Sequence, residues 1–197
     1  MSSRLLFSII LLLSSLSGFS QEAQPVASAP IEAPFHRNSI GFGVGQAFLV
    51  GDYSHLGDDA LTYDLYYAYR ASYTFQFLVN AHYNKYETDA SSIKTTSINT
   101  GIKAKIFDFD SFAPFWSLGV GFYWPQASYL EGTKQISTKK KGVFGVNASI
   151  GMDLNLNERF TIGFLTHLHY PFKAKFKNGY ELSGGYLKIL FLPTFSF

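Results

Sequence analysis

The sequence predicts an all-β protein, a transmembrane, antiparallel, up-and-down β-barrel of about eight strands. Three observations support this fold class. Apolar side chains alternate with small or polar ones along about eight segments of the chain. These segments run roughly 9–14 residues, whereas soluble strands average about 5–6 and a tilted strand needs about 9–11 to cross a bilayer. Short and long connections also take turns between the segments, as in barrels that span a membrane.

The composition excludes other classes of protein. Aromatic residues make up 18% of the chain and hydrophobic residues 47%, yet the mean hydropathy is only +0.05. A helical membrane bundle would need several apolar runs of about 20 residues, and a disordered chain would have fewer aromatics. The net charge of +2 predicts no nucleic-acid partner, and the absence of cysteine excludes disulfides and thiolate chemistry.

The chain begins with the pattern of an export signal. Arg4 precedes an unbroken apolar run at 5–16, and the small residues Gly18 and Ser20 follow at the −3 and −1 positions of a cleavage site. We therefore expect residues 1–20 to be a cleaved signal peptide. A transmembrane anchor is less favoured because the run is shorter than a bilayer span.

Two further parts follow the signal peptide. Residues 21–37 are rich in Ala, Pro, Ser and Glu, and prolines spaced through them predict a flexible periplasmic tether. Residues 38–197 form one unit, the barrel. Its alternating segments are 40–50, 61–70, 73–84, 98–106, 115–124, 143–154, 160–170 and 187–197.

The bilayer decides which face of each segment points outward. Lipid offers no hydrogen bonds, so closure must pair every strand edge, and the apolar face then contacts lipid. In 143–154 the apolar face carries Phe144 and Ile150, while Asn147 and Ser149 face the lumen. Short connections at 70–73 and 155–158 and a connection of intermediate length at 108–113 are expected in the periplasm. Longer loops at 51–60, 87–95, 125–141 and 171–182 are expected outside.

Aromatic girdles are expected where the barrel meets the two membrane surfaces. Trp116 and Trp124 lie eight residues apart, about 26 Å along a strand. A tilt near 40° projects this to roughly 20 Å, close to the apolar band of about 25 Å in such barrels. We assign Phe115, Trp116, Tyr123 and Trp124 to the girdles.

Three stretches resemble a known family. The chain ends Leu-Pro-Thr-Phe-Ser-Phe, which looks like the signal read by the barrel assembly machinery, with Phe195 and Phe197 as its aromatics. Residues 112–124 resemble the central strand of the small outer-membrane barrels of the OmpW and OmpX-like group, in which Pro-Phe or Pro-Tyr leads into Gly-x-Gly. Residues 154–160 are similar to its turn before the seventh strand. The resemblance covers most of 38–197 and implies an eight-stranded barrel in the outer membrane of a Gram-negative cell.

Polar residues on the inward face are the candidate luminal set. They are Asp64, His82, Lys103, Lys105, His167, His169 and Lys188. In a lumen that eight strands make just wide enough for side chains, we expect these charges to pair and plug the barrel. His167 and His169 could instead bind a metal, although a filler role is favoured.

The sequence lacks the catalytic residues of one enzyme class with this kind of barrel. Some eight-stranded barrels are lipid A deacylases with a His-x-Ser pair and a carboxylate near the outer rim. Here Pro171 stands two residues after His169, so the nucleophile is missing. We expect no enzyme, no cofactor and no metal.

The longer loops carry the last candidate site. Lys139, Lys140, Lys141, Lys173, Lys175 and Lys177 could contact lipopolysaccharide phosphates. An ordinary solvated loop is the alternative for any single lysine. The favoured function is structural or a surface interaction, with outer-membrane lipids and the assembly machinery as partners and a monomer as the state. A narrow channel or lateral passage for small hydrophobic molecules is the alternative, and a lipid A-modifying enzyme the second alternative.

Overall fold

The chain was analysed as a computed structural model. The structure describes residues 36–55, 57–88, 91–107, 109, 111–131, 134–138, 140–175 and 181–197. The predicted signal peptide at 1–20 lies outside the described residues, as does the predicted tether at 21–37 apart from its last two residues. Both stay predictions.

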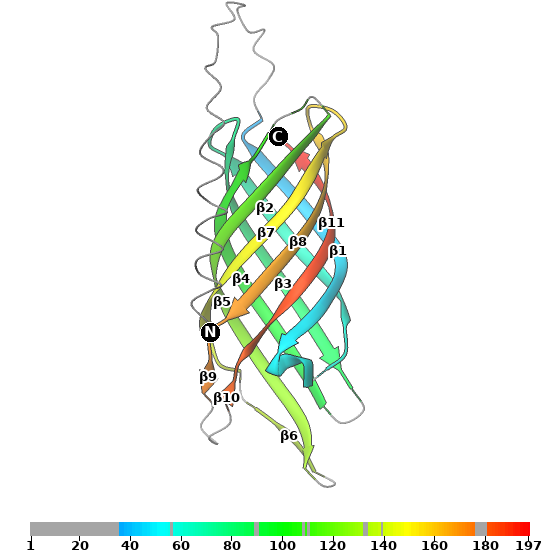
Figure 1. Cartoon of the computed structure of the whole chain (residues 1–197), viewed down its shortest axis with the longest axis vertical. Helices are drawn as coiled ribbons and strands as arrows, with labels where there is room; N and C mark the ends of the chain where they lie inside the picture. The colour runs from blue at the N-terminus through cyan, green and yellow to red at the C-terminus, as the bar shows by residue number, and fades with distance from the viewer. Residues whose placement is uncertain are drawn as a thin grey trace, which may run out of the picture. The chain divides into compact units, whose positions relative to one another are not determined.

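Within the described residues, eight long antiparallel strands close into a barrel (Figure 1). They are β1 (Asn38–Gly51), β2 (Ala60–Arg70), β3 (Phe75–Glu87), β4 (Ser91–Lys105), β5 (Phe112–Glu131), β7 (Val143–Asn155), β8 (Phe160–Pro171) and β11 (Gly184–Ser196). Each pairs with its neighbour along the chain, β11 pairs with β1, and β4 pairs with β5. Closure leaves no long strand with a free edge, as lipid requires. The predicted fold class is confirmed.

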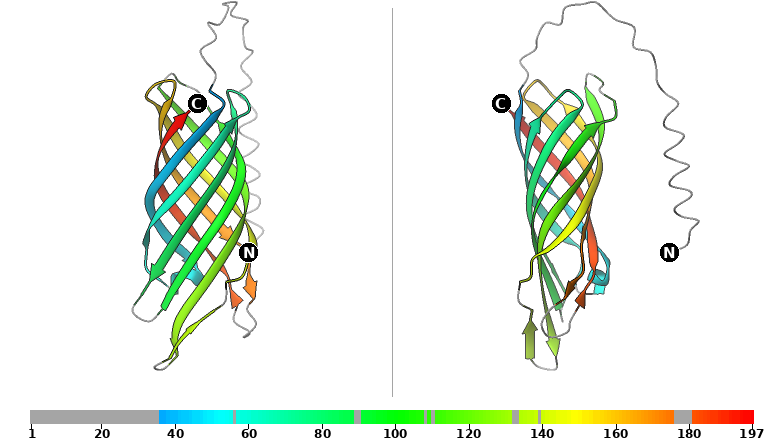
Figure 2. Two further views of the ribbon diagram at one scale, coloured as in Figure 1. Left: turned by 180° about the vertical axis from the view of Figure 1, so that it is seen from behind. Right: turned by 90° about the vertical axis from the view of Figure 1, so that its left-hand side faces the viewer.

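The pairing register fixes the slant of the strands. Starting at Pro114 on β5, the row of directly paired residues passes through Met152, Phe164, Phe191, Val44, Tyr63, Tyr83 and Thr96. It returns to β5 at Trp124, ten residues beyond its start. A stagger of this size in an eight-stranded barrel gives a tilt of about 40°, and the slant is visible in both views of Figure 2.

The two ends of the barrel differ. Tight turns at 71–74 and 156–159, the end of β4, the start of β5 and the C-terminus lie at one end, which we call the periplasmic end (Figure 1). The other end, which we call the outer end, carries η2 (Asp52–His55), β6 (Lys134–Ser137) and the hairpin of β9 (Ala174–Lys175) and β10 (Glu181–Leu182). Gly51 adopts a positive φ of 72° where β1 turns into η2, a conformation that glycine adopts without strain.

Two of the predicted loops are shorter than expected. The loop predicted at 87–95 is mostly strand, because β3 and β4 extend until Glu87 pairs with Ser92. The loop predicted at 125–141 begins as strand, since β5 continues through Pro125 to Glu131 and pairs there with β6. Pro125 lies beyond the last pair between β5 and β7, at Tyr123, so its missing amide donor removes no bond to β7.

The faces of the strands follow the predicted alternation. On β7, Ile150 is 63% exposed, whereas its neighbour Ser149 is 8% exposed. Large apolar and aromatic side chains such as Phe42, Leu118 and Ile150 are exposed on the outside of the barrel, as expected of a surface in lipid. No helix in the described part of the chain is long and apolar enough to cross a membrane.

Candidate functional site

The lumen is filled by four layers of side chains. Strand β11 contributes to all four layers. From the outer end, its inward residues are Tyr186, Lys188, Leu190 with Leu192, and Ser196. We call them the tyrosine cap, the ionic layer, the apolar layer and the basal layer. Each layer takes residues from several strands, so the barrel interior is a stacked core.

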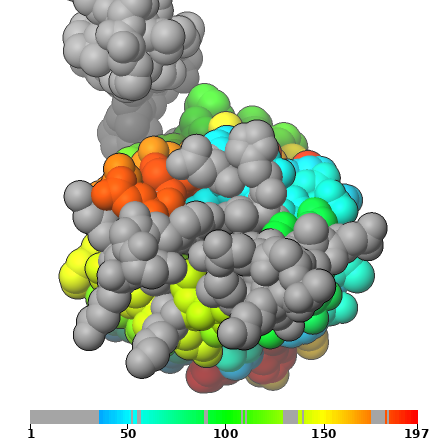
Figure 3. All heavy atoms as spheres, turned by 90° about the horizontal axis from the view of Figure 1, so that it is seen from below, coloured from blue at the N-terminus to red at the C-terminus, as the bar shows by residue number. Residues whose placement is uncertain are grey.

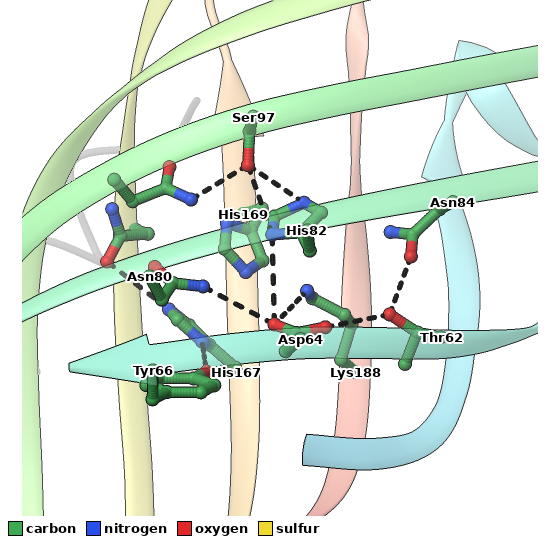
Figure 4. A network of polar contacts seen from close by, with 12 residues as sticks. Thr62, Asp64, Tyr66, Asn80, His82, Asn84, Ser97, His167, His169 and Lys188 are labelled. Atoms are coloured by element: carbon green, nitrogen blue, oxygen red, sulfur yellow. Dashed lines mark hydrogen bonds and ion pairs between the residues drawn. The ribbon is translucent and has the colours of Figure 1, made fainter. Parts of the chain in front are cut away.

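The ionic layer is built on a fully buried ion pair (Figure 4). Lys188 Nζ lies 2.6 Å from Asp64 Oδ2, and neither side chain has solvent exposure. Asp64 also accepts hydrogen bonds from Thr62 Oγ1 at 2.9 Å and Asn80 Nδ2 at 3.3 Å. A buried charge is tolerated when it is paired and its remaining lone pairs are satisfied, and both conditions hold for Asp64.

Three histidines complete the ionic layer. His169 lies between the other two, with ring centroids 4.0 Å from His167 and 4.6 Å from His82. Each is hydrogen-bonded to a tyrosine: His82 to Tyr186, His167 to Tyr66 and His169 to Tyr123. The imidazoles thus link the ionic layer to the tyrosine cap on one side and to the apolar layer on the other.

Ser97, His82 and Asp64 have the residue types of a hydrolytic triad. Ser97 Oγ lies 3.0 Å from both ring nitrogens of His82, and His82 Nδ1 lies 3.7 Å from Asp64 Oδ2. However, Ser97 has no solvent exposure, and the hydroxyl of Tyr186 lies 2.6 Å from His82 Nε2. A nucleophile needs access to a substrate carbonyl as well as a base, and this serine has none.

Metal binding also lacks a suitable geometry here. Among the described residues, no group of three or more His, Cys, Asp or Glu side chains is arranged to hold a metal ion. His169 Nε2 is buried without a hydrogen-bond partner, but both nitrogens of His167 are engaged, with Tyr66 and Asn147.

Glycines on β5 make room for the amides beside this layer. A Cβ on Gly121 would lie 1.9 Å from Asn99 Oδ1, and a Cβ on Gly119 would lie 2.4 Å from the backbone oxygen of Thr100 and 2.8 Å from Asn147 Oδ1. A side chain at Gly121 would displace Asn99, and one at Gly119 would collide with the backbone of β4 as well as with Asn147. The glycine-rich inner face of β5 is therefore part of the packing of the lumen.

The tyrosine cap closes the outer end of the lumen. It consists of Tyr53, Tyr86, Tyr123 and Tyr186, packed with Ala47 and Ile93, and every one of these side chains is at most 1% exposed. Tyr53 comes from η2, which folds over the rim; Figure 3 looks onto this end and shows η2 (cyan) and the β9–β10 hairpin (orange) at the rim. Sequence reasoning missed Tyr53 because no strand alternation applies in a loop.

The apolar layer is a second feature that the sequence did not indicate. Tyr66, Phe115, Leu165, Leu190 and Leu192 form a buried cluster inside the barrel. Leu190 and Leu192 belong to an almost continuous apolar run on β11, so alternation gave no sign that they face inward.

The basal layer is the most open of the four. Lys103 Nζ lies 2.5 Å from Asp153 Oδ2 and 3.8 Å from the centre of the Phe115 ring. The pair borders a cavity of about 50 Å³ that Lys105 also lines, together with Arg70 and Gln76. The structure therefore places all seven members of the predicted luminal set inside the barrel, in two separate groups.

The predicted girdle position is wrong for two of the four aromatic residues. Trp116 and Trp124 lie on the outward face, where Trp116 is 41% exposed and Trp124 contacts Phe122 edge to face at 4.7 Å. Phe115 and Tyr123 point into the lumen instead and are 2% and 0% exposed. They directly precede the two tryptophans on one strand, and adjacent strand residues face opposite sides.

The C-terminal aromatics both lie on the outside of the barrel. The rings of Phe195 and Phe197 are stacked 6.4 Å apart, and Phe195 also contacts Phe160 at 5.0 Å. Their role as an assembly signal stays a prediction.

The loop lysines are only partly described. Lys139 and Lys177 lie outside the described residues, as does the side chain of Lys175. Lys140 and Lys141 are exposed, and Lys173 forms an ion pair with Glu181. The expectation that these lysines contact lipopolysaccharide phosphates is thus untested, although Lys173 already has an acidic partner.

Comparisons with solved structures identify the architecture. Neisserial surface protein A aligns with a TM-score of 0.62 and 15% identity, over 81% of this chain and 97% of that one. The chain has the fold of the small eight-stranded outer-membrane β-barrels. Ail, the attachment invasion locus protein of Yersinia pestis, aligns at 0.54 and 15% identity over 82% and 99% of the two chains. The N-terminal β-barrel domain of Pseudomonas aeruginosa OprF aligns at 0.51 and 14% identity, over 83% and 100%.

Sequence comparison adds nothing to this assignment. No family model matches the chain, and no curated protein matches it. The likeness therefore concerns the fold of the barrel.

Proposed function

We propose that the protein is an integral outer-membrane barrel without catalytic activity, whose closed lumen gives it a structural or surface-interaction role. The observation that carries the proposal is the ionic layer, in which Asp64 and Lys188 pair without solvent exposure. A transport path would have to pass through this pair and through the tyrosine cap above it. The interior is packed as the core of the protein, which leaves the outer surface and loops for interaction.

Insertion into the outer membrane is supported by the two faces of the strands. Apolar side chains cover the outside, and the chain begins with the pattern of an export signal. We expect the protein in the outer-membrane fraction, with a folded form that migrates differently on gels after heating. Recovery of the protein from the soluble periplasm would contradict this placement.

The alternative, a narrow channel or lateral passage for small hydrophobic molecules, needs a continuous space. Cavities of about 50 Å³ and 30 Å³ border the basal and apolar layers. A wider recess of about 610 Å³ opens at the periplasmic end, where Arg70, Lys105 and Asn155 line both it and the basal cavity. None of these three cavities is lined by Asp64, Lys188 or a tyrosine of the cap, so none of them passes the ion pair. This arrangement favours the closed barrel over the channel.

Conductance of the purified, refolded protein in a planar bilayer tests the proposal. We expect no steady single-channel current with the parent protein. A defined, reproducible conductance would replace the proposal with the channel alternative. Mass analysis of lipid A from cells with and without the protein tests the enzyme alternative, and we expect identical spectra.

A further inference from the structure

Outward-facing residues at the outer ends of β3, β4 and β5 form three rows in direct register. The first row is Tyr83, Thr96 and Trp124, the second is Lys85, Lys94 and Gln126, and the third is Glu87, Ser92 and Ser128. None of the second row belongs to a long loop, although that is where sequence reasoning placed the cationic residues. We call the second row the lysine row.

The lysine row lies at the edge of the apolar surface. From Trp124 towards the periplasmic end, the same three strands present Ala81, Ile98 and Phe122 and further apolar residues to the outside. Tryptophan marks the interface between hydrocarbon and headgroups in such barrels. Lys94 is two residues beyond Thr96, about 5 Å along the barrel axis at a tilt near 40°. Its ammonium group therefore reaches the headgroup region.

The protein balances the charge of Lys85 but not that of Lys94. Lys85 Nζ lies 2.5 Å from Glu87 Oε1, in a pair whose side chains are 42% and 55% exposed. Lys94 is half-buried, and no described carboxylate pairs with it. Lys85 and Lys94 stand directly opposite each other on neighbouring strands, where like charges destabilise the pairing. An anion beside Lys94 would balance the remaining charge and weaken that repulsion.

Neutral hydrogen-bonding groups continue the row towards β6. Gln126 Nε2 donates to Ser137 Oγ at 3.1 Å, and Ser128 Oγ donates to the same oxygen at 3.0 Å. An amide and two hydroxyls thus lie on the same outward face as the two lysines. Ammonium, amide and hydroxyl groups together match the oxygens of a phosphate.

The opposite side of the barrel lacks this combination. Near the outer ends of β7, β8 and β1, the outward residues are Phe144, Tyr170 and Val50, which are exposed and uncharged. Lipid beside these strands contacts an aromatic and aliphatic surface, and the cationic residues nearest to it, Lys140, Lys141 and Lys173, lie outside the strands.

We propose that the lysine row binds a phosphate group of an outer-leaflet lipid, whose acyl chains lie on the apolar surface below it. This rests on the proposed function, because only a barrel inserted in the bilayer presents these strands to lipid. A lipid fits better than a free anion because the cationic row directly adjoins Ile98 and Phe122, which suit a ligand with one charged end and one apolar end. The low dielectric constant near the hydrocarbon strengthens the attraction relative to that of a loop lysine in water.

The test compares two double variants with equal loss of charge. Lys85→Gln with Lys94→Gln removes the charge of the row, and Lys140→Gln with Lys141→Gln removes the same charge from an exposed loop. Each protein is refolded in phosphatidylcholine bilayers that contain lipid A or dephosphorylated lipid A. Lipid retained per barrel after detergent extraction is then counted by native mass spectrometry.

We expect the parent and the loop variant to retain lipid A several-fold more than its dephosphorylated form, and the row variant to lose that preference. Lys94→Arg should keep it, because the charge remains. Equal retention of both lipids by the parent would overturn the proposal, as would an equal loss in the loop variant. Displacement of lipid A by millimolar inorganic phosphate would overturn it in favour of a free-anion site.

Folding is monitored in the same samples by heat modifiability, which separates a failed site from a failed barrel. The conductance measurement described above tests the proposed function independently. A conducting barrel could still bind lipid phosphate, and a closed barrel could fail to bind it.

Discussion

The two ion pairs inside the barrel join the same chemical groups in different surroundings. Lys188 and Asp64 lie 2.6 Å apart with no exposure, while Lys103 and Asp153 lie 2.5 Å apart with about a tenth of each side chain exposed. The first pair is enclosed between the tyrosine cap and the apolar layer, and the second borders a cavity near the periplasmic end. The distance between the charged atoms therefore does not predict how much each pair contributes to the stability of the barrel. We expect the difference in access to water to determine that contribution.

The largest effect is expected at the enclosed pair. Asp64→Asn leaves Lys188 charged and unpaired in a dry layer, which should lower the free energy of unfolding by about 3–5 kcal/mol. Combining Asp64→Asn with Lys188→Met should restore most of that loss, because no unpaired charge remains. Urea titrations of the refolded barrel in lipid vesicles measure both. A double variant as unstable as the single one would contradict the account.

Burial of charge on the lipid side provides the next test. Val120 lies midway between Trp116 and Trp124 on the outward face and is 56% exposed. Val120→Arg should cost about 2–4 kcal/mol, whereas Gln126→Arg, beyond the upper tryptophan on the same strand, should cost about 0–1 kcal/mol. If the same titrations give equal costs, the assigned depth of the membrane is wrong.

The smallest of the three destabilising effects is expected when the Lys103–Asp153 pair at the periplasmic end is broken. Asp153→Asn leaves Lys103 able to reach water through the cavity, so we expect a loss of about 1–2 kcal/mol, between the values for buried and surface pairs. The comparison between the two pairs fails if this variant is as unstable as Asp64→Asn in parallel urea titrations.

Much of this architecture was predictable from the sequence, for a clear reason. In a barrel the side-chain period is two along every strand, so residues such as Asp64, His82 and Lys188 could be assigned inward from alternation alone. Applied strictly, the same rule places Phe115 and Tyr123 inside the barrel. We assigned them to the girdles because they are aromatic, although the alternation along the strand favours the lumen for both. The alternation along a strand does not reveal how far neighbouring strands are shifted relative to each other. The sequence therefore could not show which inward residues share a layer.

The apolar layer and the lysine row were missed for opposite reasons. Leu190 and Leu192 are apolar residues inside a lumen expected to be polar, in a strand that is apolar on both faces. Lys85 and Lys94 are polar residues on the outward face of paired strands. Lys94 lies within the loop predicted at 87–95, and Lys85 lies just beyond the end of the strand predicted at 73–84. In both cases the position along the barrel axis decides the role, and that position follows from the register.

The central claim is that the lumen is closed by its own side chains, and thiol labelling tests it most directly. The chain has no cysteine, so single cysteine variants have no background. Ser97→Cys places a thiol in the ionic layer, at a position without exposure, and Glu158→Cys places one in an exposed turn at the periplasmic end. With a water-soluble maleimide applied to the folded barrel, we expect rapid labelling at 158 and none at 97 until urea unfolds the protein. Labelling of residue 97 in the folded barrel at a rate close to that of residue 158 would show an open, water-filled lumen and contradict the account.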